Sequence, residues 1–163
     1  MPFDPPQIDI SRRGGTYTLE TEQWLPRAPE ELFPFYADAH NLERLTPPLL
    51  RFRVITPKPI EMAAGTLIDY RLRLRGIPVG WRTRILAWEP PHRFIDEQIR
   101  GPYQLWHHEH TFAPQGDGTR VIDKVNYRML CGWIAHPLMV GRDVREIFRF
   151  RAEALWEIFG EAT

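Results

Sequence analysis

The feature that most constrains the fold is a series of six strand-like segments between residues 51 and 130. Most of them alternate apolar with polar residues and are rich in β-branched and aromatic side chains, as half-buried strands are. The connections between them are short and contain Pro or Gly, which is typical of turns between antiparallel neighbours. The sequence therefore predicts an antiparallel meander, with strands in residues 51–56, 65–76, 79–89, 92–101, 103–114 and 119–130.

Other elements precede this series. Residues 16–25 alternate well enough for a first strand. After it, Pro29 is suited to a first helical turn, Pro34 should limit that helix, and Asp38 could cap another one that ends before Pro47. The sequence therefore predicts two short helices between the first strand and the meander.

The end of the chain changes to a helical period. Residues 144–160 form a long amphipathic pattern, with Val144, Ile147, Phe148, Leu155, Ile158 and Phe159 on its apolar side. Two starts are open because Pro137 and Gly141 interrupt the preceding stretch: near Trp133 with a kink, or at about Gly141. The apolar segment 131–141 could instead form a mobile lip over a cavity.

Composition limits the class of protein. The 163 residues suit a single domain with its core at about residues 16–160. Lys+Arg and Asp+Glu both number 21, so no excess charge favours nucleic acid as a partner. No run of about 18 apolar residues predicts a transmembrane segment. A single cysteine, Cys131, and a start without a signal-peptide core favour a cytoplasmic location, with Cys131 as a buried, inert thiol.

The stretch LWHHEH at residues 105–110 concentrates histidines in one predicted strand. Alternate side chains of a strand point to opposite faces. The inner face then carries Trp106, His108, His110 and Phe112, and the outer face carries His107 and Glu109 as a solvated pair. A short turn to the next strand favours a register with Phe112 opposite Val121 and His110 opposite Asp123. A slip of two residues would set His108 opposite Asp123 instead, so in either register an aspartate meets a histidine on the inner face.

The order of these elements is that of the helix-grip fold. The stretches that carry a likeness to known proteins are ERLTPP, AWEPPHRFIDEQIRGPYQLWHHEHTF, GTRVIDKVNY and REIFRFR. With them the sequence resembles the START/Bet v 1-like (SRPBCC) superfamily, and within it the bacterial polyketide cyclase/dehydrase-like branch. The resemblance implies an α+β fold in which a curved, antiparallel seven-stranded sheet wraps around the long C-terminal helix and leaves a cavity that is open at one end.

Such a cavity would bind a small hydrophobic molecule that is aromatic, polyketide-like or lipid-like. Its expected wall combines aromatic side chains with a few polar groups, which suits a flat apolar ligand. The inward candidates are Tyr70, Leu72, Trp81, Phe94, Gln98, Trp106, His108, His110, Asp123 and Tyr127, with Phe148 or Leu155 from the helix. The same side chains could also simply fill a core.

The meeting of histidine and aspartate on the inner face leaves three interpretations open. His108, His110 and Asp123 could bind zinc, although we expect no metal and no cofactor in the resting protein. His110 and Asp123 could be the acid/base pair of a cyclase or dehydratase, with Tyr127 or Gln98 holding a substrate oxygen. The favoured interpretation is a structural or ligand-orienting group.

For the whole protein, a regulatory protein-contact module is a third class of function, after ligand binding and cyclase/dehydratase catalysis. The chain is expected to be a monomer or a homodimer.

Overall fold

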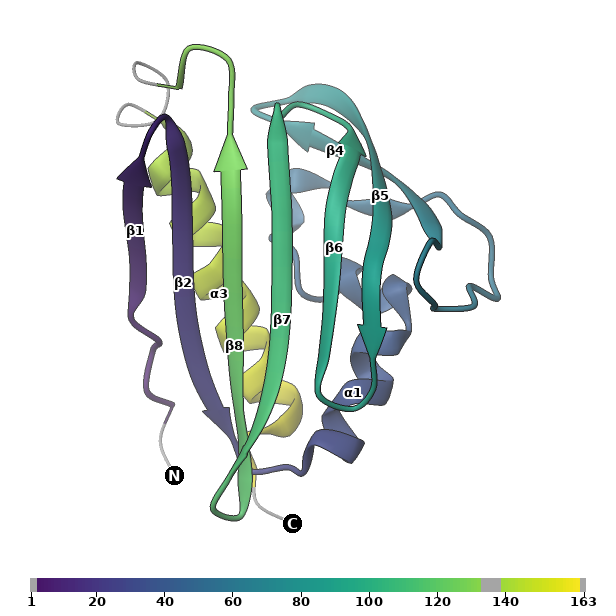
Figure 1. The fold of residues 1–163 in the computed structure, drawn as a ribbon, viewed down its shortest axis with the longest axis vertical. Helices are drawn as coiled ribbons and strands as arrows, with labels where there is room; N and C mark the ends of the chain where they lie inside the picture. Colours follow the sequence, from purple (N-terminus) through teal and green to yellow (C-terminus); the bar gives the residue numbers. More distant parts are fainter. Residues whose placement is uncertain (1–2, 133–138, 162–163) are drawn as a thin grey trace.

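The chain forms one antiparallel sheet whose face is crossed by a long helix, α3 (Gly141–Phe159) (Figure 1). The structure is a computed structural model that describes residues 3–132 and 139–161. Its eight strands lie in the order β1-β2-β8-β7-β6-β5-β4-β3. Their bounds are β1 (Ile8–Arg13), β2 (Thr16–Leu25), β3 (Arg53–Val54), β4 (Leu67–Leu74), β5 (Ile77–Glu89), β6 (Arg93–Arg100), β7 (Leu105–Gln115) and β8 (Gly118–Arg128).

This is the predicted α+β helix-grip architecture, with one strand more than the seven expected. The additional strand is β1, which pairs with β2 in an antiparallel hairpin. Gly14 and Gly15 make the turn with φ values of 55° and 82°, a left-handed conformation that glycine adopts without strain. The sequence analysis missed β1 because the prolines that precede it and the charged residues within it hid the alternation of Ile8 and Ile10.

Short helices connect β2 to β3, as predicted. They are α1 (Pro29–Ala37) and the 3-10 turns η1 (Ala39–Glu43) and η2 (Pro48–Leu50). Asp38 caps η1 by accepting a hydrogen bond from the His40 backbone at 3.0 Å. The expectation that Pro34 limits the first helix was wrong: α1 continues to Ala37. A proline at this point removes only one backbone hydrogen bond of so short a helix.

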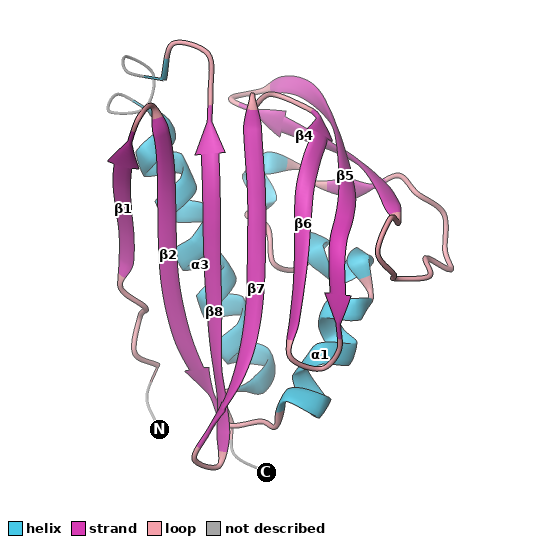
Figure 2. Cartoon of the chain, in the orientation of Figure 1, coloured by secondary structure: helices cyan, strands magenta, loops and turns pink. Residues whose placement is uncertain are grey.

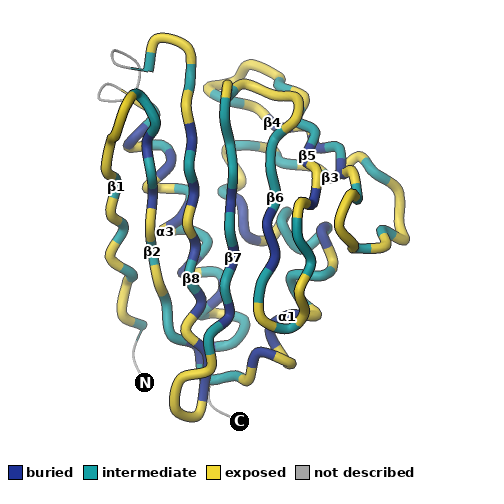
Figure 3. Tube along the Cα trace, in the orientation of Figure 1, coloured by how far each residue is buried: buried dark blue, intermediate teal, exposed yellow. Residues whose placement is uncertain are grey.

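The strands, drawn as arrows in Figure 2, carry residues that alternate between buried and exposed positions (Figure 3). In β4 the side chains of Tyr70 and Leu72 are buried, and those of Arg71 and Arg73 are exposed on the outer face. The first strand of the meander, expected at 51–56, is only the two-residue β3. The other five are observed close to their predicted positions.

The C-terminal helix begins at Gly141, the later of the two predicted starts. Its buried side includes Val144, Phe148 and Leu155, as the apolar pattern predicted. The predicted lip falls largely on residues 133–138, which lie outside the described residues. Cys131 is exposed, which corrects the expectation of a buried thiol. It follows the end of β8 in a turn, with φ of 52°, and therefore has no sheet around it.

Within the described ranges, no helix combines the length and apolar character needed to cross a lipid bilayer.

Candidate functional site

A cavity of about 160 Å³ lies among the sheet, the α1–η2 segment and α3. Its wall is mainly apolar and aromatic. The predicted wall residues that line it are Tyr70, Leu72, Trp81, Phe94, Trp106, His108, His110 and Phe148. Strand alternation placed the residues of β4, β5, β6 and β7 on the face of the sheet that borders the cavity, and helical spacing placed Phe148 on the sheet-facing side of α3.

Of the predicted wall residues, Asp123 and the alternative Leu155 border a smaller hollow instead of the cavity. Gln98 and Tyr127 are not part of the described cavity wall either. The Gln98 amide donates to the Tyr103 carbonyl at 2.6 Å and accepts from the Tyr103 backbone N–H at 3.2 Å. It is therefore engaged in closing the loop between β6 and β7. Tyr127 is fully buried and stacks on Tyr17, with 5.6 Å between ring centroids. The assignments of Gln98 and Tyr127 to the wall were wrong for these local reasons.

Among the polar wall residues that the sequence analysis missed are Tyr36 from α1, Asp96 from β6 and Arg151 from α3. Asp96 stands between Phe94 and Gln98 at alternate positions of one strand, so the same alternation points it inward. Arg151 follows Phe148 by three residues and therefore shares its helical face. For Tyr36, nothing in the sequence fixed how α1 packs on the sheet.

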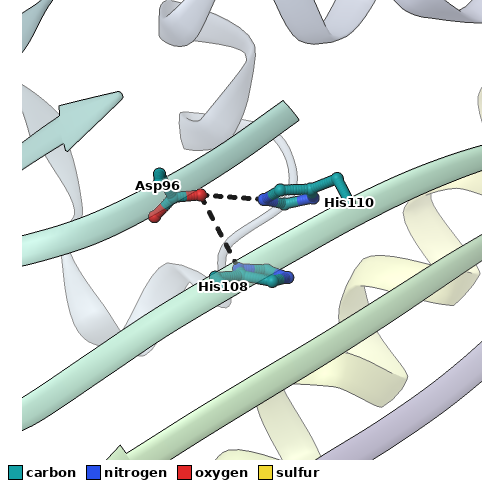
Figure 4. Close-up of side chains that lie close together, drawn as sticks. All are labelled: Asp96, His108 and His110. Carbon is teal, nitrogen blue, oxygen red and sulfur yellow. Dashed lines mark hydrogen bonds and ion pairs between the residues drawn. The ribbon is translucent and has the colours of Figure 1, made fainter. Parts of the chain in front are cut away.

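Two aspartates and two histidines meet at one end of the cavity. The predicted register is confirmed, since His110 lies opposite Asp123 and His108 opposite Val125. His108 donates from Nε2 to Asp123 Oδ1 at 2.7 Å, and His110 donates from Nε2 to Asp96 Oδ2 at 2.9 Å. Two further contacts cross these bonds: His110 Nδ1 lies 3.0 Å from Asp123 Oδ1, and His108 Nδ1 lies 3.9 Å from Asp96 Oδ2 (Figure 4). Each imidazole thus stands between two carboxylates.

The rings of the cluster pack closely against one another and against two phenylalanines. The centroids of His108 and His110 are 3.7 Å apart, and Phe94 covers the His110 ring at 4.0 Å with an interplanar angle of 15°. Phe148 contacts His108 edge-on at 5.6 Å. Packing on these faces restricts how far either imidazole can turn.

The carboxylates differ in what they face. Asp96, His108 and His110 line the cavity, whereas Asp123 lies behind the histidines, beside a small hollow that Thr21 and Gln23 also border. Asp123 therefore supports the histidines from within the core, and Asp96 is the carboxylate that a bound molecule would meet.

Burial and contacts with charged neighbours act in opposite directions on the pKa values of the cluster. Burial opposes ionisation of Asp123, but contacts with His108 and His110 hold its pKa well below the usual range. The pKa of Asp96 is lowered for similar reasons, despite burial, by His110 and His108. Burial and the neighbouring charge of His110 lower the pKa of His108 to about 4. Burial also disfavours charge on His110, but Asp123 and Asp96 outweigh it and raise the pKa. These shifts favour positive charge on His110, beside the Asp96 carboxylate, over positive charge on His108.

Four buried side-chain atoms near the cluster have no hydrogen-bond partner among the described residues: His110 Nδ1 within it, Thr21 Oγ1 behind it, and, on other residues of the cavity wall, the Tyr36 hydroxyl and Arg151 Nε. The last two are the donors that a bound molecule would meet. Both are buried and both residues line the cavity. The Arg151 guanidinium lies 4.8 Å from the Phe148 ring centroid, a cation–π distance. These atoms could hydrogen-bond an oxygen of a molecule in the cavity.

The outer face of β7 carries His107 and Glu109, as predicted. The expected solvated pair between them is not what forms, because Glu109 accepts a hydrogen bond from Arg93 Nε at 2.5 Å. Arg93 and Glu109 stand on neighbouring strands, where cross-strand pairs of opposite charge form readily. His107 is therefore a half-buried histidine outside the cluster, one residue away from His108.

Comparison with known proteins identifies the family. Residues 25–155 match the family model described as "Polyketide cyclase / dehydrase and lipid transport". The chain belongs to this family. The superfamily resemblance is confirmed as well, since the match spans the short helices, strands β3 to β8 and most of α3, and Bet v 1-like structures are among the solved neighbours. Among curated proteins, no sequence matches the chain.

Several solved structures share the fold. Protein Ms6760 from Mycobacterium smegmatis has a TM-score of 0.69 at 18% identity, over 94% of this chain and 97% of that one. Protein CV1439 from Chromobacterium violaceum has a TM-score of 0.70 at 14% identity, over 88% and 97%. Major latex-like protein 151 from Panax ginseng has a TM-score of 0.67 at 10% identity, over 90% and 99%. At these identities the likeness establishes the fold alone.

Proposed function

We propose that the protein binds a small hydrophobic molecule, aromatic, polyketide-like or lipid-like, in the cavity between the sheet and α3. The observation that carries this proposal is a mainly apolar cavity with a buried ionic cluster at one end. Apolar walls with a few fixed polar groups are the usual composition of a ligand site. The family description, which joins cyclases and dehydrases with lipid transport, supports the same class of ligand.

The volume of the cavity limits the size of the ligand. Its volume of about 160 Å³ is close to the roughly 150 Å³ of an engineered cavity that accepts benzene. One or two flat rings fit without rearrangement. The Tyr36 hydroxyl and Arg151 Nε are the unpaired donors of the wall, so we expect the ligand to carry an oxygen at its polar end.

Replacing Leu72 by Trp tests the cavity. Leu72 is buried in the wall, so the indole would occupy ligand space. We expect the affinity for 1-naphthol, a fluorescent two-ring probe with one oxygen, to fall at least about tenfold, because less apolar area is buried. The matched control is Ile77→Trp on the neighbouring strand, where the side chain is 67% exposed. Fluorescence titration measures both variants, and mass spectrometry of an organic extract identifies any native ligand. Equal affinity in the wild type and Leu72→Trp contradicts the proposal.

A second candidate function is acid/base catalysis of the cyclase or dehydratase type. The observation that favours it is the position of His110 on the cavity wall between two carboxylates. The sequence analysis proposed His110 with Asp123 as the pair. We retain Asp123 as the carboxylate behind the ring and add Asp96 as the one that faces the ligand. In place of Gln98 and Tyr127, Tyr36 is the hydroxyl placed to hold an oxygen.

His110→Gln tests this catalytic role. If His110 transfers a proton, the variant should convert the molecule recovered from the native protein about 100-fold or more slowly, the usual contribution of such a group. The assay follows product by mass spectrometry in protein treated with a chelator. The control is His107→Gln, on the opposite face of the same strand, which should turn over the substrate as fast as the wild type does. Undiminished turnover in His110→Gln rules out the catalytic assignment.

A further inference from the structure

We propose that Asp96, His108 and His110 bind a divalent transition-metal ion at the end of the cavity, and that Asp123 orients the two imidazoles from behind. The proposal rests on the same cavity as the proposed function and adds a cofactor to it. It replaces the expectation of no metal, which considered only His108, His110 and Asp123 as ligands.

The three ligand atoms are already near one another. One atom from each of Asp96, His108 and His110 lies within 4.8 Å of the other two. Asp96 Oδ2 is 2.9 Å from His110 Nε2 and 3.9 Å from His108 Nδ1 (Figure 4). Atoms that share a metal ion at about 2.1 Å are themselves about 3 to 4 Å apart. Small side-chain movements would therefore suffice to place one ion among them.

Asp123 meets the opposite nitrogen of each ring. Its Oδ1 lies 2.7 Å from His108 Nε2 and 3.0 Å from His110 Nδ1. Histidines that bind metal almost always donate their second N–H to such a carboxylate, which fixes the tautomer. The His108 contact is a hydrogen bond, whereas His110 Nδ1 is close but not aligned for one, so a slight turn of its ring completes the pair.

The charge of the two carboxylates and the position of the three ligands on the cavity wall both favour a metal ion here. Two buried carboxylates need compensating positive charge, and a divalent ion between neutral imidazoles supplies it. The ion would replace the proton that His110 Nε2 shares with Asp96. The three ligands line the cavity and Asp123 does not, so the remaining coordination positions face the ligand space.

The donor set selects the ion. Two imidazoles with one carboxylate suit zinc or iron(II), whereas magnesium and calcium prefer oxygen ligands alone. An oxygen of the ligand or a water molecule would complete the coordination beside Tyr36 and Arg151. A catalytic rather than structural metal site has this open form.

Metal titration of the wild-type chain is the first test. Protein purified without a polyhistidine tag and stripped with a chelator is titrated with zinc by calorimetry, and with iron(II) without oxygen. We expect one ion per chain with a Kd of about 1 µM or tighter for zinc or iron(II). Cobalt(II) bound at the site should show the intense visible absorption bands of an ion coordinated by four or five nitrogen and oxygen atoms. The absence of a saturable site, or the weak cobalt spectrum of the hydrated ion, overturns the proposal.

Variants assign the ligands. His108→Ala and Asp96→Asn should each weaken zinc binding about 100-fold, and Asp123→Asn about 10- to 100-fold, the usual effect of losing a supporting carboxylate. The matched control is His107→Ala, on the outer face of the same strand, which should bind as the wild type does. Wild-type affinity in His108→Ala and Asp96→Asn, or an equal loss in His107→Ala, contradicts the assignment. If a ligand variant fails to fold by circular dichroism, the cobalt spectrum of the wild type decides.

The outcome is separable from that of the proposed function. Leu72→Trp should lose the fluorescent probe and still bind zinc, because Leu72 is not a ligand. Probe binding without metal binding refutes the metal site alone, and metal binding without probe binding refutes the hydrophobic ligand alone.

Discussion

Asp96 and Asp123 approach the same two imidazoles from opposite sides, and this gives two identical side chains different roles. Asp123 lies in the core behind both rings, where it fixes their orientation. Asp96 lies on the cavity wall, where it can contact a bound molecule as well as the histidines. Loss of either would leave a buried imidazole without part of its charge compensation, which is costly in an apolar interior. The cluster therefore acts as one unit.

Tyr36 offers a test of an unpaired group at the residue scale. Its hydroxyl is buried without a hydrogen-bond partner in the described structure, so Tyr36→Phe removes an uncompensated polar atom and should leave the free energy of unfolding unchanged or higher by up to about 1 kcal/mol. The control is Tyr17→Phe, which removes a hydroxyl that donates to the Gly132 carbonyl at 3.0 Å and should cost about 1 kcal/mol. Urea denaturation of both variants measures the difference. A loss in Tyr36→Phe as large as in Tyr17→Phe contradicts this account.

At the scale of elements, strand alternation predicted most of what the structure shows. It placed the cavity side of β4 and β7 correctly because residues of one strand must alternate between faces. The hairpin register followed from the short turn between β7 and β8. Whether Tyr36 lines the cavity depends on how α1 packs on the sheet, and no periodic pattern in the sequence predicts that packing. Asp96 and Arg151 had a signal but were passed over, since charged residues on an apolar face are rare.

At the scale of the molecule, α3 is held against the sheet by two separate clusters, and the cavity lies beside them. Toward its start, Val144 and Phe148 pack with Tyr17 and Val125. Toward its end, Leu155 joins the cluster that contains Leu25, Phe33 and Phe112. Because both ends of the helix are fixed by close packing, it cannot settle onto β4–β6 to fill the space. The cavity is therefore a consequence of the fold as a whole.

The edges of the sheet lead to a prediction of the oligomeric state. An exposed edge strand invites pairing with a second copy unless it is short or charged. At one edge β3 has two residues, and at the other β1 exposes Asp9, Arg12 and Arg13. We therefore expect a monomer, which light scattering coupled to size exclusion should report as a mass of 19.2 kDa. Replacing Asp9 and Arg13 together by Val removes edge charges and should promote self-association with rising concentration. A wild-type mass of twice the monomer value, unchanged on dilution, would mean that another surface pairs the chains.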